Sequence, residues 1–297
     1  MTEARVAAQA KINLRLKVLA RDVEGYHSIE TIFARIDLAD DVVVRTGTSG
    51  RSVDCHGAEL GPVEKNLAFR AATAYESATG WPNNFSIEIT KRIPVGGGLG
   101  GGSADAGAVL RALDAMAPRP LGPRLVTLGA ELGADVPFMT LEAPFALGWS
   151  RGERLFPLPT LPWHSVVIAT PEHAIATAES YGWIATSRNV SGAIPSMGFS
   201  PTAFVMDSTA VRDWTRIASI ASNDFDAVVF ARFPELAKAA ASLRQNGAMI
   251  SMLAGSGSSV IGVFEQQRDA EKALADSPLT GLLSRTSTSV VGVTVSG

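Results

Sequence analysis

The sequence lacks several features that would quickly assign it to a class of protein. Its single cysteine, Cys55, cannot form an internal disulfide, which is usual in a reducing compartment. No apolar run approaches the roughly 20 residues of a membrane-spanning helix, and Lys11 and Arg15 interrupt the start of the chain before a signal-peptide core can form. These absences favour a cytoplasmic protein.

A surplus of positive charge is also missing. The chain has 26 Lys and Arg against 29 Asp and Glu, which gives a formal net charge of -3 at pH 7. Binding to nucleic acid or to a membrane surface through charge needs a broad basic field. We therefore expect neither as a partner, and an anionic ligand must be bound by local groups.

The chain does have enough apolar residues for a large core. Hydrophobic residues make up 46% of its 297 positions, and strand patterns alternate with helix patterns, which indicates a mixed α+β protein of two domains. Prolines gather between residues 155 and 163, the composition of a connection between domains. We place the domains at residues 1–157 and 158–297.

The periodicity of the N-terminal half predicts its first elements. Apolar and polar residues alternate over 12–18, which is typical of a half-buried strand and places Lys11 and Asn13 together on the side away from the core. Further strands are expected over 29–37, 42–45 and 85–90. Asn66 is a candidate cap for a helix that Gly80 ends, and another helix is expected over 124–132.

The C-terminal half has the same mixture. A strand is predicted over 165–170, a helix over 177–185, and helices over 234–246 and 267–275. Two apolar strands flank the Gly-Ser turn near residue 256, and a last strand is expected over 289–295. The segment 187–207 is polar and shows no clear period. This order of elements indicates a compact α+β second domain.

The segment "IPVGGGLGGGSADAG", residues 93–107, has six glycines in seven positions and then a helical pattern. Ordering so many glycines costs conformational entropy, so the loop must serve a purpose. A dinucleotide fingerprint would need an acidic residue at the end of a second strand about 20 positions on, and a P-loop would need a lysine before its Ser or Thr. Neither is present. A phosphate cradle of backbone amides at a helix N-terminus fits better, with Ser103 as the predicted helix cap.

Asp105 complicates this interpretation of the loop. A carboxylate in the first turn of a helix suits the helix dipole, but it would repel a phosphate bound there. We expect that Asp105 either points aside or meets a cation.

These motifs resemble those of the kinase superfamily of galactokinase, homoserine kinase, mevalonate kinase and phosphomevalonate kinase (GHMP kinases). The order of "AKINLRLKV", "GYHSIETIF", "PVGGGLGGGSADAG", "GADVPF", "SNDFDAVVFARFPEL" and "GSGSSV" resembles, within it, the family of 4-diphosphocytidyl-2-C-methyl-D-erythritol kinases. The resemblance implies an N-terminal domain of ribosomal-protein-S5-like topology and a ferredoxin-like C-terminal domain. It also implies ATP-dependent phosphorylation of the 2-hydroxyl of 4-(cytidine 5′-diphospho)-2-C-methyl-D-erythritol, a step of non-mevalonate isoprenoid synthesis.

The resemblance also implies roles for single residues. Asp135 would be the base, Lys11 would orient it and stabilise the transferring phosphoryl group, and Asn13 would bind the acceptor hydroxyls. Tyr26 and His27 would meet the cytosine, and Tyr181 is the candidate for the opposing ring. The ATP phosphates would lie on Pro94, Val95, Gly96, Gly97, Gly98, Leu99, Gly100, Gly101, Gly102, Ser103 and Ala104.

Some features stay open from the sequence. Mg²⁺ is expected with ATP, but the sequence shows no acidic cluster that would be its binding site. Ser103 together with water is one option for its ligands. A monomer and a homodimer are both compatible with the pattern. Two other functions remain: a sister GHMP kinase acting on another alcohol, and a nucleotide-binding protein without catalysis.

Overall fold

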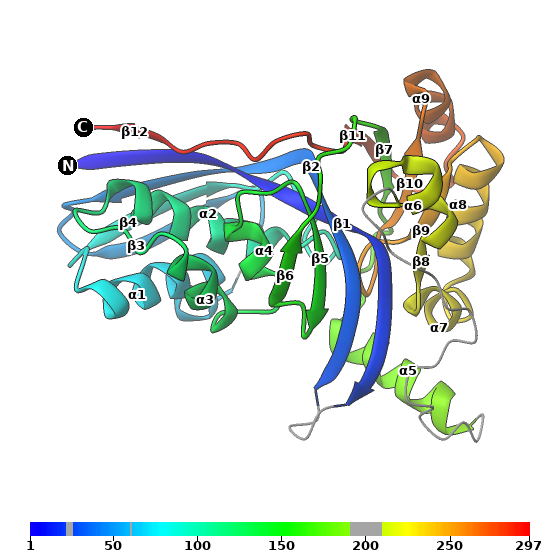
Figure 1. The fold of residues 1–297 in the computed structure, drawn as a ribbon, viewed down its shortest axis with the longest axis horizontal. Coiled ribbons are helices and arrows are strands. Elements are labelled where there is room, and N and C mark those ends of the chain that lie inside the picture. Colours follow the sequence, from blue (N-terminus) through cyan, green and yellow to red (C-terminus); the bar gives the residue numbers. More distant parts are fainter. Residues whose placement is uncertain (22–25, 60, 191–209) are drawn as a thin grey trace.

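The computed structural model describes residues 1–21, 26–59, 61–190 and 210–297. The turn expected at 22–25 and most of the segment 187–207 lie outside the described residues. The chain forms two sheets with helices packed on them, and the first and last strands run side by side at one end (Figure 1). The mixed α+β class predicted from the sequence is therefore confirmed.

The larger sheet has the strand order β12-β1-β2-β4-β3, with β5 and β6 continuing from β2 and β8 beside β1. Its strands are β1 (Thr2–Arg21), β2 (His27–Thr46), β3 (Arg51–His56), β4 (Phe85–Thr90), β5 (Phe145–Ser150), β6 (Arg154–Pro157), β8 (Ser222–Asn223) and β12 (Thr294–Ser296). Strands β8 and β12 come from the C-terminal half, so the halves share this sheet. The domain division at residue 157 stays a prediction.

Helices α1 to α4 pack around this sheet, as Figure 1 shows. Their bounds are α1 (Leu67–Thr79), α2 (Gly101–Met116), α3 (Arg124–Ala130) and α4 (Val136–Thr140), with a short 3₁₀ helix at Val63–Lys65. Asn66 caps α1 as predicted, because its side chain accepts a hydrogen bond from the Ala68 amide, and Gly80 ends the helix in the left-handed conformation.

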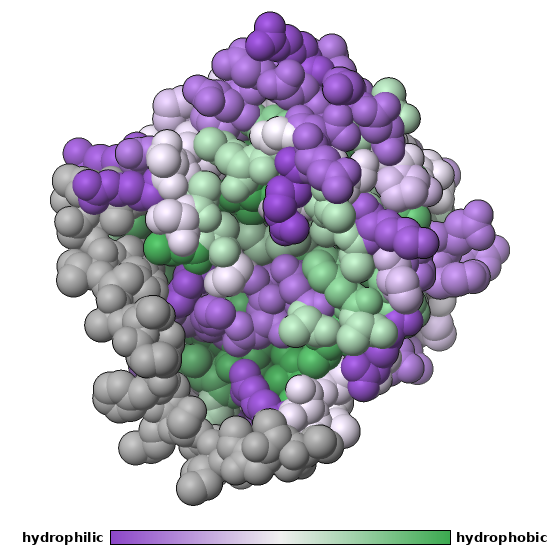
Figure 2. Space-filling view, turned by 90° about the vertical axis from the view of Figure 1, so that its right-hand side faces the viewer, coloured by the Kyte–Doolittle hydropathy of each residue, from purple (hydrophilic) through white to green (hydrophobic). Residues whose placement is uncertain are grey.

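The smaller sheet has the order β11-β7-β10-β9. It consists of β7 (Ser165–Ala169), β9 (Ile250–Leu253), β10 (Val260–Phe264) and β11 (Gly281–Arg285). Around it lie α5 (Thr177–Val190), a 3₁₀ helix at Ala210–Arg212, α6 (Trp214–Ile220), α7 (Phe225–Phe230), α8 (Pro234–Gln245) and α9 (Gln267–Ala275). Figure 2 shows this end of the molecule, where hydrophobic residues are visible mainly in the centre and hydrophilic ones around the edge.

Three expectations about strands need correction. The strands predicted over 29–37 and 42–45 are one strand, because the residues between them stay paired with β1. The last strand begins at Thr294, five residues later than expected. Lys11 and Asn13 do share a side of β1, but both are buried, because helices and loops cover the face that the alternation had assigned to solvent.

Among the described residues, none of the helices combines the length and the apolar character that crossing a bilayer requires.

Candidate active site

The buried side chain of Lys11 lies where three segments meet. Its Nζ is 3.4 Å from Asp135 Oδ2, donates to Asn13 Oδ1 at 2.9 Å and donates to the Gly98 carbonyl at 3.0 Å. The lysine side chain is only 5% exposed, whereas that of Asp135 is 28% exposed. The two residues predicted to be catalytic are thus brought together, with the carboxylate open to an incoming ligand and the ammonium behind it.

The glycine-rich loop contacts Lys11 through its backbone and lies directly against the turn at 254–259. Ser258 and Ser259 donate their amides to the carbonyls of Gly96 and Gly97, at 3.4 and 3.3 Å. A Cβ added to Gly98 would lie 1.9 Å from the Ala254 carbonyl oxygen, and Gly98 also has a φ of +78°. The turn can approach this closely only because the loop has no side chain at that position.

Helix α2 begins earlier than predicted. Gly100 is the N-cap residue, with a φ of +72°, and no side chain caps the helix, so the expected Ser103 cap is wrong. The reason is that Gly101 and Gly102 already adopt helical conformation, and the first intrahelical bond runs from the Ala104 amide to the Gly100 carbonyl at 2.8 Å. The amides that precede that of Ala104 point out of the start of α2, where they are available to bind an anion.

Asp105 meets a cation, one of the two alternatives that the sequence left. Its Oδ2 accepts from Lys91 Nζ at 2.7 Å, and Lys91 also pairs with Asp40. Asp40 in turn accepts the amides of Arg92 and Ile93, at 2.5 and 2.8 Å. This buried cluster of Asp40, Lys91 and Asp105 joins both ends of the glycine-rich loop to β2. Lys91 was not predicted from the sequence, although the charge of Asp105 required such a partner.

The Asp105 carboxyl is in an unusual environment within this cluster. Its Oδ1 is buried and has no hydrogen-bond partner among the described residues. Burial raises the pKa of this carboxyl to about 7, while the nearby Lys91 ammonium opposes the rise. The net charge of the Asp105–Lys91 pair near the start of α2 is therefore small, because the ammonium compensates the carboxyl group when it is ionised.

The helix expected over 124–132 would place Asp135 just after a helix end, but in the structure Asp135 directly precedes another helix. It is the N-cap residue of α4, while α3 ends at Ala130. Pro137 lies in the first turn of α4, where its missing amide costs nothing, so the proline begins a new helix and does not simply fix a turn.

Asn13 has partners for both ends of its amide. Its Oδ1 accepts from Lys11, and its Nδ2 donates to Thr31 Oγ1 at 2.7 Å. The Thr31 hydroxyl in turn donates to the Arg15 carbonyl, also at 2.7 Å. This chain fixes the orientation of Asn13 and through it that of the lysine, and the predicted contact of Asn13 with a hydroxyl stays a prediction.

The aromatic residues predicted to bind a base lie together at the far end of β1 and β2. His27 and Tyr181 stack with ring centroids 5.3 Å apart and an interplanar angle of 23°. Tyr26 is 58% exposed, and the Arg151 guanidinium lies 4.1 Å from its ring centroid. Burial and, to a smaller degree, the charge of Asp135 raise the pKa of the Tyr181 phenol to about 12, so the phenol is neutral at pH 7.

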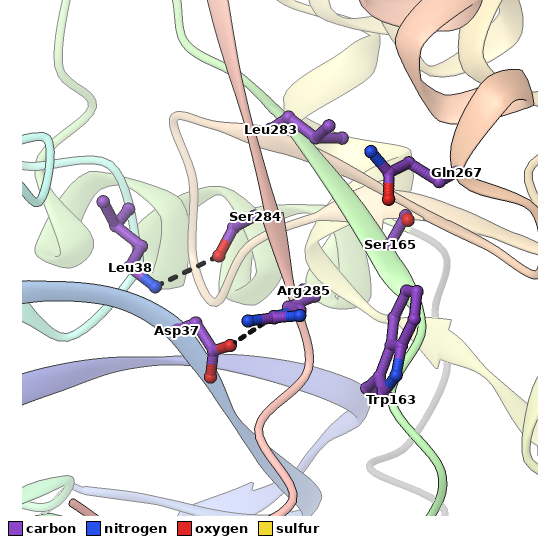
Figure 3. Close-up of a pocket in the computed structure, with 8 residues that line it drawn as sticks. All are labelled: Asp37, Leu38, Trp163, Ser165, Gln267, Leu283, Ser284 and Arg285. Atoms are coloured by element: carbon purple, nitrogen blue, oxygen red, sulfur yellow. Dashed lines mark hydrogen bonds and ion pairs between the residues drawn. The ribbon is translucent and has the colours of Figure 1, made fainter.

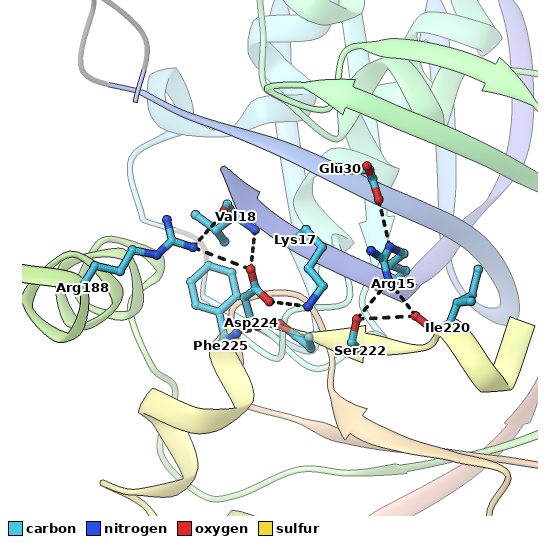
Figure 4. A network of polar contacts seen from close by, with 10 residues as sticks. Arg15, Lys17, Val18, Glu30, Arg188, Ile220, Ser222, Asp224 and Phe225 are labelled. Carbon is cyan, nitrogen blue, oxygen red and sulfur yellow. Dashed lines mark hydrogen bonds and ion pairs between the residues drawn. The ribbon is translucent and has the colours of Figure 1, made fainter. Parts of the chain in front are cut away.

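A polar network holds α5, which carries Tyr181, against the end of β1 (Figure 4). Arg188 donates to the Val18 carbonyl at 2.5 Å and lies 3.7 Å from Asp224 Oδ2. Asp224 accepts from Lys17 Nζ at 2.8 Å and from the Val18 amide at 2.9 Å. These contacts give Asp224 a structural role between β1 and α5.

No preformed metal site is visible in the part of the chain that the structure describes, where three or more His, Cys, Asp or Glu side chains nowhere converge. Asp105, the acidic residue of the loop region, already forms an ion pair with Lys91. The hydroxyl of Ser103 has no hydrogen-bond partner among these residues.

One pocket, of about 380 Å³, lies elsewhere (Figure 3). Arg285 pairs there with Asp37 at 2.7 Å, and the Leu38 amide donates to Ser284 Oγ at 3.1 Å. None of the predicted site residues lines it. Because the charged groups suited to catalysis lie around Lys11, the surroundings of Lys11, and not this pocket, are the candidate active site.

The fold and the groups around Lys11 define a small-molecule kinase of the GHMP type. Residues 66–143 match the GHMP kinases N terminal domain, and residues 205–276 match the GHMP kinases C terminal family. The chain belongs to the 4-diphosphocytidyl-2-C-methyl-D-erythritol kinase family of these proteins, as the similarity to individual relatives shows.

Three relatives illustrate this similarity. The 4-diphosphocytidyl-2-C-methyl-D-erythritol kinase of Solibacter usitatus (strain Ellin6076) is 39% identical over 272 residues, which are 91% of this chain and 84% of that protein. The kinase of the same name from Geobacter sp. (strain M21) is 35% identical over 280 residues, 93% of this chain and 95% of that one. A crystal structure of 4-(cytidine 5'-diphospho)-2C-methyl-D-erythritol kinase aligns with a TM-score of 0.75 and 33% identity, covering 95% and 98% of the two chains.

Proposed function

We propose that this protein transfers the γ-phosphoryl group of ATP to the 2-hydroxyl of 4-(cytidine 5′-diphospho)-2-C-methyl-D-erythritol. The observation that carries the proposal is the position of Lys11, whose ammonium contacts both Asp135 and the carbonyl of Gly98 in the glycine-rich loop. A base and a phosphate loop joined by one cation is the arrangement that phosphoryl transfer between two bound ligands needs.

The loop 94–104 would bind the ATP phosphates. The start of α2 has no side-chain cap, and its first amides are directed where phosphate oxygens would lie. The Lys91 ammonium compensates the Asp105 carboxylate behind this site. Mg²⁺, which kinases generally use, would offset the negative charge of the phosphates, and the Ser103 hydroxyl is the protein group that would help to hold it.

The reaction would proceed by displacement at the γ-phosphorus. The acceptor oxygen forms a bond to phosphorus, the bond to the β–γ bridging oxygen breaks, and ADP leaves with that electron pair. Asp135 accepts the hydroxyl proton and later releases it to water, while Lys11 stabilises the charge on the phosphoryl oxygens. Asn13 would contribute by holding Lys11, to which it is hydrogen-bonded, and by meeting the acceptor hydroxyls.

The cytosine would lie at the ring pair of His27 and Tyr181, with Tyr26 beside it. Stacked atoms lie about 3.5–4 Å apart, so a base between two rings needs about 7 Å between the rings. The His27 and Tyr181 centroids are 5.3 Å apart, so a base entering between them would have to separate them by about 2 Å. The His27 imidazole bonds to the Leu19 carbonyl through Nδ1 and accepts from Arg21 at Nε2, which fixes its tautomer and its plane.

The test is an ADP-release assay with purified protein, ATP, Mg²⁺ and the cytidylyl erythritol compound. Replacing Asp135 by Asn should lower kcat about 10²–10⁴-fold, the usual contribution of a general base, and leave the affinity for ATP nearly unchanged. Asp37→Asn is the matched control, because Asp37 also pairs with a cation but lies outside the site. Full activity of Asp135→Asn would remove Asp135 from the mechanism.

The same assay separates the two alternatives. ADP release with homoserine or mevalonate, but not with the cytidylyl compound, would indicate a sister kinase. ATP binding without ADP release on any of these alcohols would indicate a nucleotide-binding protein without catalysis. The ion pair of Lys11 with Asp135 favours catalysis, because a protein that only bound nucleotide would not need a base there.

A further inference from the structure

Arg35 is a buried arginine that the mechanism above does not use. It lies on β2 with 1% of its surface exposed, and no carboxylate lies within ion-pair distance in the described parts of the chain. Its guanidinium instead donates to backbone carbonyls, to that of Phe138 at 2.7 Å and to that of Leu141 at 3.1 Å, with a longer contact to Ala143 at 3.4 Å.

Those carbonyls belong to the end of α4 and to the residues that follow it. Helix α4 has five residues, too few to be stable without its surroundings. A cation at the C-terminal end of a helix compensates its unpaired carbonyls and the negative end of its dipole. Arg35 therefore binds one end of the short helix that has Asp135 at its other end.

The register of the large sheet connects Arg35 to Lys11. The two residues lie directly opposite each other on β2 and β1, so their side chains leave the sheet on the same face. Lys11 contacts Asp135 before the first residue of α4, and Arg35 contacts the carbonyls at its end. One cross-strand pair of cations thus holds both ends of α4.

Two further contacts fix α4 over this pair. The Phe138 ring stacks on that of Phe33 with centroids 4.8 Å apart, and the Arg35 guanidinium lies 5.0 Å from the Phe138 centroid. On the opposite side, α2 approaches so closely at Gly107 that an added Cβ would lie 2.5 Å from the Met139 Cβ. Movement of α4 is restricted on both sides, and Arg35 restrains its end.

Burying this cation is costly. Burial lowers the pKa of the Arg35 guanidinium to about 9, so it remains charged at pH 7 without a carboxylate to compensate it. Well-packed apolar residues often replace buried charges without loss of stability. A role in stability alone therefore does not explain why an arginine is present.

We infer that Arg35 is a positioning residue for phosphoryl transfer, which holds the carbonyls at the end of α4 and thereby sets the position of Asp135 relative to Lys11. The inference rests on the proposed function for Asp135. It predicts that Arg35 affects the chemical step and not the binding of either substrate, since no observed contact of Arg35 lies in the glycine-rich loop or at the ring pair.

The experiment compares Arg35→Met and Arg35→Lys with wild type in the ADP-release assay, with kcat and both KM values measured. Since a displacement of about 1 Å can cost 10²-fold in rate, we expect Arg35→Met to lower kcat at least 10-fold and each KM to change less than threefold. Arg35→Lys keeps the charge but lacks the planar, forked guanidinium, so its kcat should lie between those of Arg35→Met and wild type. Arg244→Met is the control, because Arg244 also donates to a backbone carbonyl, that of Ser251 at 2.9 Å, but lies on α8, away from α4.

A purely structural role would lower the melting temperature and leave kcat per folded molecule unchanged. Folded Arg35→Met protein with kcat within twofold of wild type would overturn the inference. If Arg35→Met does not fold, Arg35→Lys decides in the same way: a lowered kcat with both KM values retained supports the inference, and an unchanged kcat overturns it. In the background of Asp135→Asn, the effect of Arg35→Lys on kcat should disappear.

Failure of the proposed function would be seen separately, as absence of activity in the wild type. A crystal structure of the Arg35 variant then still tests the inference. We expect the end of α4 to move and the distance from Lys11 Nζ to Asp135 Oδ2 to exceed its present 3.4 Å. An unchanged α4 in that structure would overturn the inference.

Discussion

Gly98→Ala tests how the glycine-rich loop is built. The residue has a φ of +78°, and an added Cβ would lie 1.9 Å from the Ala254 oxygen and 2.8 Å from the Gly257 oxygen. Both neighbours are backbone atoms, so the clash cannot be relieved by rotating a side chain. Either the loop or the turn at 254–257 must move.

The expected loss in the free energy of unfolding of Gly98→Ala is the sum of two costs. A left-handed conformation costs a non-glycine residue about 1–2 kcal/mol, and forcing an extra carbon into a packed region costs about 1–3 kcal/mol. Their sum, about 2–5 kcal/mol, is a large part of a typical stability of about 5–15 kcal/mol. Activity should fall too, because the Gly98 carbonyl that accepts from Lys11 Nζ would be displaced.

Gly80→Ala provides the control for backbone strain. Gly80 has a φ of +74°, but an added Cβ there has no atom within 4 Å. In denaturant unfolding, Gly80→Ala should therefore lose only the free energy of the left-handed conformation, whereas Gly98→Ala should also lose that of the steric clash. Only Gly98→Ala should raise the KM for ATP. Equal destabilisation by the two substitutions, with activity retained in both, would refute the close contact of loop and turn.

Two further substitutions test the surroundings of the site. Lys91→Met would leave Asp40 and Asp105 unpaired in the interior and should cost about 3–5 kcal/mol in denaturant unfolding, with partial recovery in Lys91→Met/Asp105→Asn; a loss under 1 kcal/mol would contradict the buried cluster. Tyr181→Leu removes a stacking surface worth about 1–3 kcal/mol and should raise the KM for the cytidylyl substrate about 5- to 150-fold at constant KM for ATP; an unchanged KM would exclude Tyr181 from the base site.

Local patterns allowed the sequence to predict much of the fold. The cap at Asn66, the left-handed Gly80 and the strand at 85–90 follow from neighbouring residues alone. The order of the motifs led to the family. The predictions of the cap, the helix end and the strand succeeded because each depends on interactions within a few residues.

The remaining features depend on distant segments. The alternation around Lys11 correctly placed it opposite the apolar residues of β1, but it could not show that α4 and the glycine-rich loop bury that face. About 100 residues separate Arg35 from the Phe138 carbonyl that it binds, and 14 residues separate Lys91 from Asp105. No local period in the sequence reveals either contact. Helix α4 is too short to show a helical period, which is why the sequence did not predict a helix directly after Asp135.

The structure also indicates why a loop of so many glycines can be ordered. Asp40 of β2 accepts the amides of Arg92 and Ile93 before the loop, and Lys91 binds Asp105 after it. Ser258 and Ser259 bind its middle from the opposite side. Because both ends of the loop are held through Asp40 of β2, part of the entropy of ordering the loop is lost before a nucleotide binds, which lowers the cost that remains on binding. The same sheet carries Lys11 and Arg35, so the phosphate loop and the base are positioned by one rigid element.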